Sequence, residues 1–456
     1  MQYVFFLIGF FSTAVFSNEN TTEKSLTLQS ALQILMKKSP TLNAHREVVE
    51  QAENKHEASM GKFLPQLSIK ARSTMINDPI AVDLNPIRSV ILGLHPQVPE
   101  AAIPSFEVPV QDDVFHNLSA SVIWPIFTGG RLWANYSASK QGMTSARLKH
   151  RHEEQKIKHE LMDYYFKLLL SKEVKLLYDS VSSSVKKHTD NAEKLAKNGM
   201  IAYAEKLRAD VALAEAKNDL RVSVRNSELA NLALQSKLHF DKPINPSSEL
   251  FLIPNLLPLD HWIQKAKLNH PLLKLLKSEA DRSEAGVIAT RGAFLPTVAL
   301  FGNKELYTED LTMLEPEWSV GIVMTYPLFN GGTHLQEHQS AKSVKRQINY
   351  HLNAAKTNVE LLVEKQYREV VNALEEVSYM EEVMKLAEEN LRAQSLAFKA
   401  GLTTSLHVMD AEQSLLKVRV GRLKALYTAD MSYISLNESC NQIESVLNIM
   451  KDVRND

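Results

Sequence analysis

The chain has 456 residues, 23% of them charged, and a formal net charge of −1, so its bulk electrostatics do not indicate a nucleic-acid partner. Its 15 glycines and 17 prolines make up about 7% of the residues, against a usual level of about 12%, which favours long helices. Cys440 is the single cysteine, which excludes an internal disulfide and a cysteine-based metal cluster.

The first recognisable element is an apolar run, YVFFLIGFFSTAVF, at Tyr3–Phe16. It is shorter than a membrane-spanning helix and predicts a secretory signal peptide over residues 1–17, although the usual basic start is missing. No cysteine stands directly after the run, so we expect no N-terminal lipid anchor. No later stretch has 18 uninterrupted apolar residues, so we expect no transmembrane helix in the mature chain.

The rest of the chain contains an ordered internal repeat. WPIFTGGR at Trp124–Arg131 returns 202 residues later as YPLFNGGT at Tyr326–Thr333. GKFLPQL at Gly61–Leu67 returns as GAFLPTV at Gly292–Val298. A repeat of this length predicts one architecture built twice rather than three separate domains.

We expect the first copy to span residues 18–246 and the second residues 247–456. Their main difference is an insertion of about 29 residues in the first copy, at about Met75–Phe115. It holds six prolines, which predict irregular structure over most of its length. We expect a surface loop, dispensable for assembly, at the strand ends remote from the helices. Four apolar residues could fold it over the barrel mouth as a partial lid, namely Ile87, Val90, Ile91 and Leu92.

Two-residue alternation predicts two strands in each copy. In the first copy, Leu67 and Ile69 alternate with Ser68 and Lys70. The expected strands cover about 65–76, 116–127, 296–306 and 316–329. Apolar-out, polar-in alternation with aromatic residues near one end is typical of transmembrane barrel strands. A half-buried soluble hairpin gives the same alternation and remains an alternative at this point.

Four strands cannot close a barrel, and lipid does not tolerate open sheet edges, so several chains must share one barrel. Two chains would give eight strands with a filled interior, whereas three give twelve strands and a lumen. Proline cannot continue a strand ladder and glycine relaxes the backbone, so these residues mark the transitions between strand and helix. The transition residues are Pro65, Pro125, Gly129, Gly130, Pro296, Pro327, Gly331 and Gly332.

Two long helices are expected over about 130–198 and 332–400, each followed by a second helix, over about 201–239 and 403–450. The long helices have no proline and would reach roughly 100 Å. In the second copy a residue of a coiled-coil seam recurs every seven positions, from Val363 through Val370 and Val377. Gly199 and Gly401 are expected to be helix C-cap glycines at which each helix turns back.

Taken together, these motifs resemble the TolC-type outer-membrane factors, the outer membrane efflux protein family. The resemblance rests on LTLQSALQILMKKSPTL at Leu26–Leu42, the paired FLP and Gly-Gly motifs, and KAGLTTSLHVMDAEQSLL at Lys399–Leu416. It implies a mixed α/β membrane protein: a homotrimer whose outer-membrane β-barrel takes four strands from each chain and continues into a long α-helical coiled-coil barrel.

The resemblance also implies a function and partners. The expected function is a passive exit duct of a tripartite efflux or type I secretion system of a Gram-negative bacterium, lying in the outer membrane and extending into the periplasm. A periplasmic adaptor, an inner-membrane transporter and outer-membrane lipid are the expected partners. No enzyme activity, cofactor or metal site is expected.

In this family, acidic residues a few positions past the turn glycine surround the periplasmic entrance. The matching positions here are Glu205 in the first copy and His407 and Asp410 in the second. The family usually has a carboxylate where His407 stands and often an arginine where Thr403 stands, so this entrance departs from the usual latch. Alternatively, these residues are ordinary exposed helix charges. A ring of carboxylates predicts cation selectivity, which protonation of a histidine would weaken below about pH 6.

Other functional classes find little support in the sequence. It contains no glycine-rich phosphate loop, no GxSxG and no HExxH motif. His334 and His338 are spaced to share a metal, but no third ligand is evident, and a solvated helix face accounts for both. The basic stretch RLKHRH at Arg147–His152 could meet lipid head groups or a partner, but a solvated face accounts for it as well. The remaining alternatives are a non-conducting secreted coiled-coil scaffold or adhesin, and a hairpin-forming periplasmic adaptor.

Overall fold

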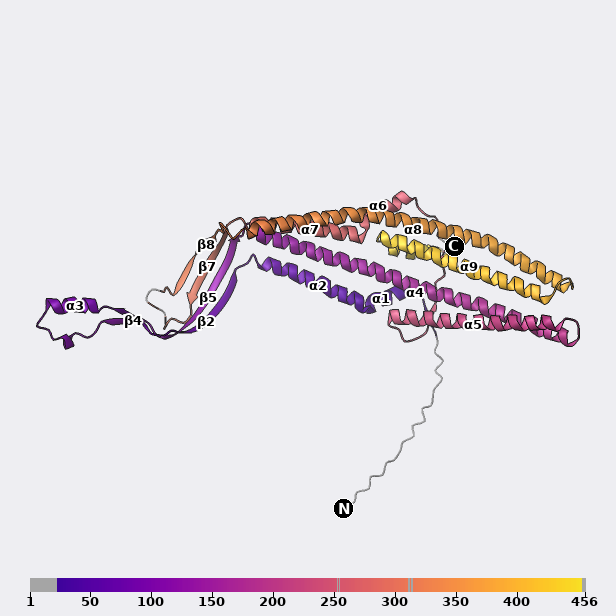
Figure 1. Ribbon diagram of the computed structural model, residues 1–456, viewed down its shortest axis with the longest axis horizontal. Coiled ribbons are helices and arrows are strands. Elements are labelled where there is room, and N and C mark those ends of the chain that lie inside the picture. The colour runs from indigo at the N-terminus through magenta and orange to yellow at the C-terminus, as the bar shows by residue number, and fades with distance from the viewer. Residues whose placement is uncertain (1–22, 252, 254, 311, 313–314, 453–456) are drawn as a thin grey trace, which may run out of the picture. The chain divides into compact units, whose positions relative to one another are not determined.

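A computed structural model describes residues 23–251, 253, 255–310, 312 and 315–452 (Figure 1). The expected signal peptide, residues 1–17, lies outside the described residues. The chain divides into two compact units: a helical unit within Met1–Asn43, His152–His270 and Asn358–Asp456, and a sheet unit formed by Ala44–Arg151 and Pro271–Thr357. Each unit therefore takes segments from both sequence copies.

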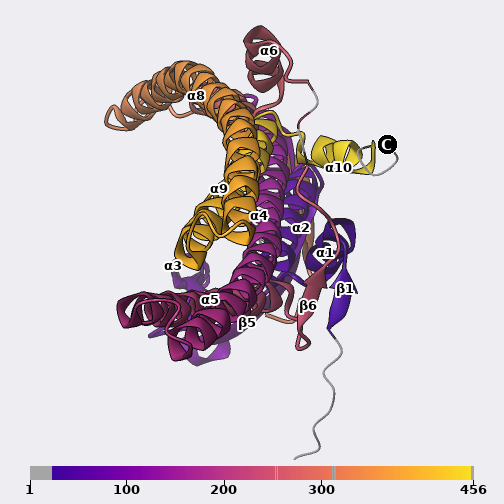
Figure 2. The same ribbon diagram turned by 90° about the vertical axis from the view of Figure 1, so that its right-hand side faces the viewer.

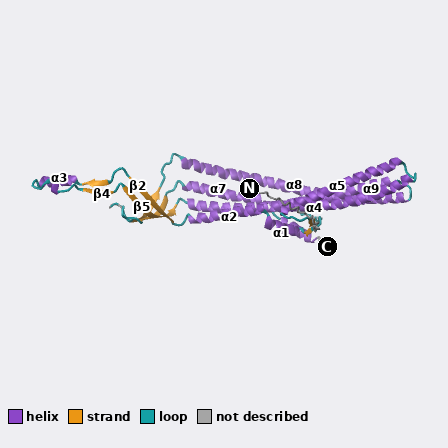
Figure 3. Cartoon of the chain, turned by 90° about the horizontal axis from the view of Figure 1, so that it is seen from below, coloured by secondary structure: helices purple, strands orange, loops and turns teal. Residues whose placement is uncertain are grey.

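The sheet unit contains a four-stranded antiparallel sheet, orange in Figure 3. Its order is β2-β5-β7-β8, so the hairpin of the first copy lies beside the hairpin of the second. The strands are β2 (Gln66–Met75), β5 (Val114–Phe127), β7 (Thr297–Glu305) and β8 (Trp318–Thr325). β5 and β7 join the two copies, with Ser121 opposite Asn303. Within the described chain, the outer edges of β2 and β8 have no strand partner.

The insertion of the first copy has regular structure, which corrects the expectation of an irregular loop. Two short strands, β3 (Ile80–Asp83) and β4 (Glu107–Gln111), pair antiparallel. Between them lie the helix α3 (Asn85–Leu94) and a 3-10 turn at Glu100–Ala102. The expectation failed because the prolines occupy tolerated positions. Pro86 lies in the first turn of α3, and Pro109 lies on the two-stranded ribbon beside a register shift.

Ten helices and the short β1·β6 pair complete the described part of the chain. The 67-residue helices α4 (Arg131–Lys197) and α8 (Thr333–Lys399) contribute to both units. The shorter helices are α1 (Leu28–Lys38), α2 (Pro40–Gly61), α5 (Tyr203–Leu238), α6 (Leu259–Asn269), α7 (Pro271–Gly292), α9 (Ser405–Ser439) and α10 (Ile443–Asp452), in addition to α3. β1 (Lys24–Leu26) pairs parallel with β6 (Ile244–Pro246), as Figure 2 shows. None of the described helices combines the length and the apolar character needed to cross a membrane.

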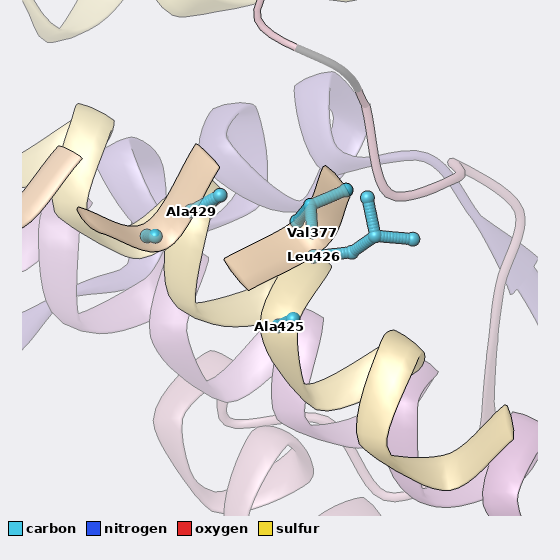
Figure 4. Packing of buried hydrophobic residues seen from close by; sticks show 5 residues of the cluster. Val377, Ala425, Leu426 and Ala429 are labelled. Atoms are coloured by element: carbon cyan, nitrogen blue, oxygen red, sulfur yellow. The ribbon is translucent and has the colours of Figure 1, made fainter. Parts of the chain in front are cut away.

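The core of the helical unit follows the seven-residue spacing of the second copy. Val363, Val370 and Val377 of α8 are buried. Val377 packs against Leu426 and two alanines of α9, Ala425 and Ala429 (Figure 4). Small residues on α9 let the two helices approach closely, and each fully buried aliphatic side chain contributes roughly 1.5–3 kcal/mol.

The last expected helix, 403–450, is interrupted in the structure. α9 ends at Ser439, and Asn441 adopts a left-handed conformation with φ of 57° before α10 begins. The Gln442 backbone N–H donates to the Asn437 carbonyl at 2.9 Å, which satisfies one of the carbonyls left over at the helix end. Cys440 is buried at this break, and its thiol contacts the Trp262 carbonyl oxygen at 3.6 Å. Asparagine is one of the few residues that tolerate this conformation, so it provides the stop that the helical pattern does not reveal.

Candidate functional site

The two helix turns of the helical unit have the same local geometry. Gly199 and Gly401 have positive φ angles of 69° and 75°. In each turn the residue after the glycine donates its backbone N–H to a carbonyl five residues earlier, Met200 to Leu195 and Leu402 to Ala397, both at 2.9 Å. This is the Schellman arrangement, which needs a residue without a Cβ at the left-handed position. The glycines therefore turn each long helix back into its partner helix.

The candidate entrance residues lie just beyond these glycines, on two different helices. Glu205 is half-buried in the first turn of α5, where a negative charge interacts favourably with the helix dipole. His407 and Asp410 are exposed near the start of α9. The Thr403 and Thr404 hydroxyls each lie 3.1 Å from His407 Nδ1. The structure thus brings Thr403 and His407 together, but the described residues show no hydrogen bond or ion pair between Glu205 and Asp410.

A polar contact near the turns was not indicated by the sequence. The Ser184 hydroxyl of α4 donates to Glu412 Oε1 of α9 at 2.6 Å, and His188 Nε2 lies 3.8 Å from the same oxygen. Burial by itself would raise the pKa of Glu412, but contacts with His188 and Ser184 outweigh it and lower that pKa. Glu412 Oε2 and His188 Nδ1 are buried without a hydrogen-bond partner. Ser184 and Glu412 are 228 residues apart, so no local pattern could have indicated this contact.

Apolar packing surrounds the same contact. Val185 of α4, Ala216 of α5 and Met409 of α9 form a buried cluster. The ring of His188 also meets the ring of Phe398 edge-on, with centroids 6.2 Å apart. The two hairpins of one chain are therefore joined near their turns by a small hydrophobic cluster with a charged group at its side.

At the strand-to-helix junctions, both Gly-Gly pairs have positive φ angles, 63° and 81° at Gly129 and Gly130 and 68° and 80° at Gly331 and Gly332. Pro65 and Pro296 directly precede β2 and β7, and Pro327 follows β8.

Pro125 differs from these prolines because it lies inside β5. The strand continues to Phe127, since Pro125 stands at a register shift where the ladder is irregular. Gly292, the first residue of the repeated GAFLPTV motif, is a further junction residue whose role the sequence did not indicate. A Cβ on Gly129 would lie 2.4 Å from the Gly292 carbonyl oxygen, so both backbones need glycine there.

The remaining candidates from the sequence have structural partners. His338 Nδ1 lies 3.1 Å from the Thr290 hydroxyl, and the rings of His334 and His338 both pack edge-on against Phe294. Arg147 of the basic stretch donates twice to Glu53 Oε1, at 2.6 and 3.1 Å. Among the described residues, no group of three or more histidine, cysteine or acidic side chains is placed to hold a metal ion.

Known proteins of similar structure indicate the class of this fold. The fold matches the outer-membrane channel OprN with a TM-score of 0.73 at 16% identity, over 91% of this chain and 90% of that chain. The chain thus shares the fold of this channel, and the expected mixed, helix-rich architecture is confirmed. Residues 262–442 match the family described as outer membrane efflux protein. The resemblance to this family is confirmed over these residues.

Two curated relatives extend the comparison. The alkaline protease secretion protein AprF of Pseudomonas aeruginosa is 26% identical over 40% of this chain, and this match spans only 39% of the relative. The cobalt-zinc-cadmium resistance protein CzcC of Cupriavidus metallidurans is 22% identical over 66% of this chain and 72% of the relative.

Proposed function

We propose that this protein is the passive outer-membrane exit duct of a tripartite efflux or type I secretion system. The observation that carries the proposal is a sheet of four strands whose outer edges have no strand partner among the described residues. The fold of the chain also matches an outer-membrane channel over 91% of its length. Lipid does not tolerate such edges, so the sheet must be completed by further copies. Three copies give twelve strands around a lumen.

The proposed location is the outer membrane of a Gram-negative bacterium, with the helices extending into the periplasm. The helix turns at Gly199 and Gly401 would then form the entrance, where an adaptor and an inner-membrane transporter deliver the cargo. AprF is named for protein secretion and CzcC for metal resistance, which supports export as the shared function. The duct itself needs no catalytic centre, because the transporter supplies the energy.

At the proposed entrance, Glu205 and Asp410 each occur three times in a homotrimer. Six carboxylates around one axis would attract cations and make the closed duct cation-selective. The exposure of Asp410 and His407 supports a role facing water at the entrance.

Two measurements test the proposal. The detergent-extracted protein should have a mass of about 150 kDa by light scattering, three times the 51.4 kDa chain. In a planar lipid bilayer it should produce discrete conductance steps. A secreted scaffold or adhesin would give no channels, and a stable monomer would contradict the shared barrel.

A further inference from the structure

Two pairs of equivalent helices in the two copies of the repeat have matching boundaries at constant offsets. α2 (Pro40–Gly61) and α7 (Pro271–Gly292) differ by 231 residues at both ends. α4 (Arg131–Lys197) and α8 (Thr333–Lys399) differ by 202 residues at both ends. Any position of the first copy can therefore be assigned an equivalent in the second without a gap inside these elements.

The strand registers follow the same two offsets. In the first hairpin, Gln66 of β2 lies opposite Ile123 of β5, and in the second, Thr297 of β7 lies opposite Thr325 of β8. The equivalence holds along the ladder to Ser73 opposite His116 and Lys304 opposite Trp318. Applying the two offsets to the register of the first hairpin therefore gives the observed register of the second hairpin.

One contact between the two copies of the repeat is made within the chain, whereas the equivalent contact is not. β5 pairs with β7, but their equivalents, β8 and β2, are the two outer edges of the sheet. Gly129 lies against the Gly292 carbonyl, but a Cβ on either equivalent glycine, Gly331 or Gly61, would meet nothing within 4 Å.

Burial on the adjoining helices shows the same difference. Ser145 of α4 is buried against α7, where it donates to the Ser278 hydroxyl at 3.1 Å. Its equivalent on α8, Gln347, is exposed, and so is Gln336, the equivalent of the buried Ala134. A second copy placed by the same geometry would cover these positions.

We propose that β8 pairs antiparallel with β2 of a second copy of this chain in one particular register. Transferring the β5·β7 register puts Val323 opposite Arg72 of the partner subunit, because these residues are equivalent to Ser121 and Asn303. It also places the Gly331 backbone against Gly61 of the partner subunit. This inference rests on the proposed function and deepens it, since it names the contacts that join the subunits.

The chemistry of the two edges agrees with this register. Met324 falls opposite Ala71 of the partner subunit and Tyr326 opposite the partner's Ile69, so the apolar face of β8 continues into the apolar face of β2. Thr325 falls opposite Lys70 of the partner subunit, on the other face. A slip of one residue would place each apolar side chain on the wrong face of the sheet.

Cysteine cross-linking of the full-length protein tests the register. In Val323→Cys/Arg72→Cys, a short thiol-specific cross-linker should join subunits into covalent dimers and trimers on a denaturing gel. Two shifted pairs keep the same face and serve as matched controls: Val323→Cys/Lys70→Cys and Val323→Cys/Thr74→Cys. We expect roughly tenfold less cross-linking in these, because the Cβ separation rises from about 5 Å to about 7–8 Å.

The outcomes separate this inference from the proposed function. More cross-linking in a shifted pair, or none in any pair of a protein that is still trimeric by light scattering, overturns the register and leaves the duct in place. A monomeric protein without cross-links overturns both.

A second test does not depend on cysteine chemistry. Gly61→Ala should lower the temperature at which the trimer dissociates, although the single chain has room for the added methyl group. Gly286→Ala, at a helical glycine that is equally open, is the matched control and should not lower it. Equal dissociation temperatures for the two variants would contradict the contact between Gly331 and the partner's Gly61.

Discussion

The two strand-to-helix junctions of this chain have the same backbone but different surroundings. Thr128–Arg131 and Asn330–Thr333 both contain two glycines with φ angles near 65° and 80°. In the first junction Gly129 is closed in by the Gly292 backbone, whereas in the second Gly331 is open within the single chain. The backbone conformation is therefore set by the local sequence, and the packing around it depends on which segment lies next to it.

The largest expected effect comes from adding a methyl group at the closed junction. Gly129→Ala should lower the free energy of unfolding by about 3 kcal/mol or more, because the left-handed conformation costs about 1–2 kcal/mol and a backbone carbonyl must also move. An added Cβ at Gly130 would meet nothing within 4 Å, so Gly130→Ala should lose only the free energy that the left-handed conformation costs. Thermal unfolding followed by circular dichroism measures both.

The same measurement at the second junction sharpens the comparison. If the partner subunit fills it, Gly331→Ala in the assembled protein should match Gly129→Ala, and Gly332→Ala should match Gly130→Ala. A loss at Gly331 no larger than that at Gly332 would mean that the second junction stays open in the assembly.

The helix turns give a comparison of charge rather than of packing. Glu205→Ala/Asp410→Ala should reduce the cation selectivity of the closed duct several-fold, because six carboxylates leave the entrance of the trimer. Reversal potentials in a salt gradient measure this. Glu215→Ala/Glu382→Ala removes the same charge farther from the turns and should have little effect. An unchanged reversal potential in the first variant would assign Glu205 and Asp410 to the solvated helix surface.

A smaller, pH-dependent effect is expected where the two copies meet within the helical unit. His159 of α4 contacts the Glu438 carboxylate of α9. Burial by itself would lower the pKa of His159, but Glu438, with Asp163 and Glu160 nearby, raises it above its ordinary value. In the repeat, the residue equivalent to His159 is Leu361 and the residue equivalent to Glu438 is Ser236, so this ionic contact occurs only once in the chain's described residues.

Because the folded-state pKa of His159 is raised, its stabilisation is complete below the ordinary histidine range and is lost as the pH rises through the folded-state pKa. His159→Gln should therefore cost about 1 kcal/mol at pH 5.5 and much less at pH 9. Unfolding midpoints at the two pH values measure the difference. In a Glu438→Gln background the same substitution should lose its pH dependence, and a pH dependence that persists there would point to Asp163 or Glu160 instead.

The smallest effect is expected for the insertion. Replacing residues 77–112 by Asn-Gly should leave the protein trimeric, with a mass of three times that of the shortened chain, because β3 and β4 form a sheet of their own and α3 bonds to the segment before β4. The hydrogen bond from the Ile76 backbone N–H to the Asp113 carbonyl at 2.8 Å already closes the hairpin. Loss of trimers on light scattering would show that the insertion takes part in subunit contacts.

Local signals in the sequence account for much of this fold. Alternation at Leu67–Lys70 and the seven-residue spacing of Val363, Val370 and Val377 indicate the element types directly, because each period matches one backbone geometry. The failures have equally local causes. Prolines of the insertion occupy positions that strands and helices tolerate, and the left-handed Asn441 ends α9 without a glycine.

Contacts between distant segments lay beyond the sequence. Ser184 and His188 meet Glu412 only because two hairpins pack together, and the Gly129–Gly292 approach depends on the order of the strands in the sheet. No period or motif within one segment contains that information. The entrance residues Glu205, His407 and Asp410 came from the family resemblance, and their role stays a prediction.

The buried cysteine at the helix break has a consequence for how this chain matures. Burial raises the pKa of the Cys440 thiol to about 11, so at neutral pH almost no reactive thiolate exists in the folded protein. In an oxidising compartment the folded chain should therefore undergo disulfide exchange slowly, and with a single cysteine it needs no internal disulfide. The thiol becomes alkylatable only when the break between α9 and α10 opens, which makes Cys440 a built-in reporter of local unfolding.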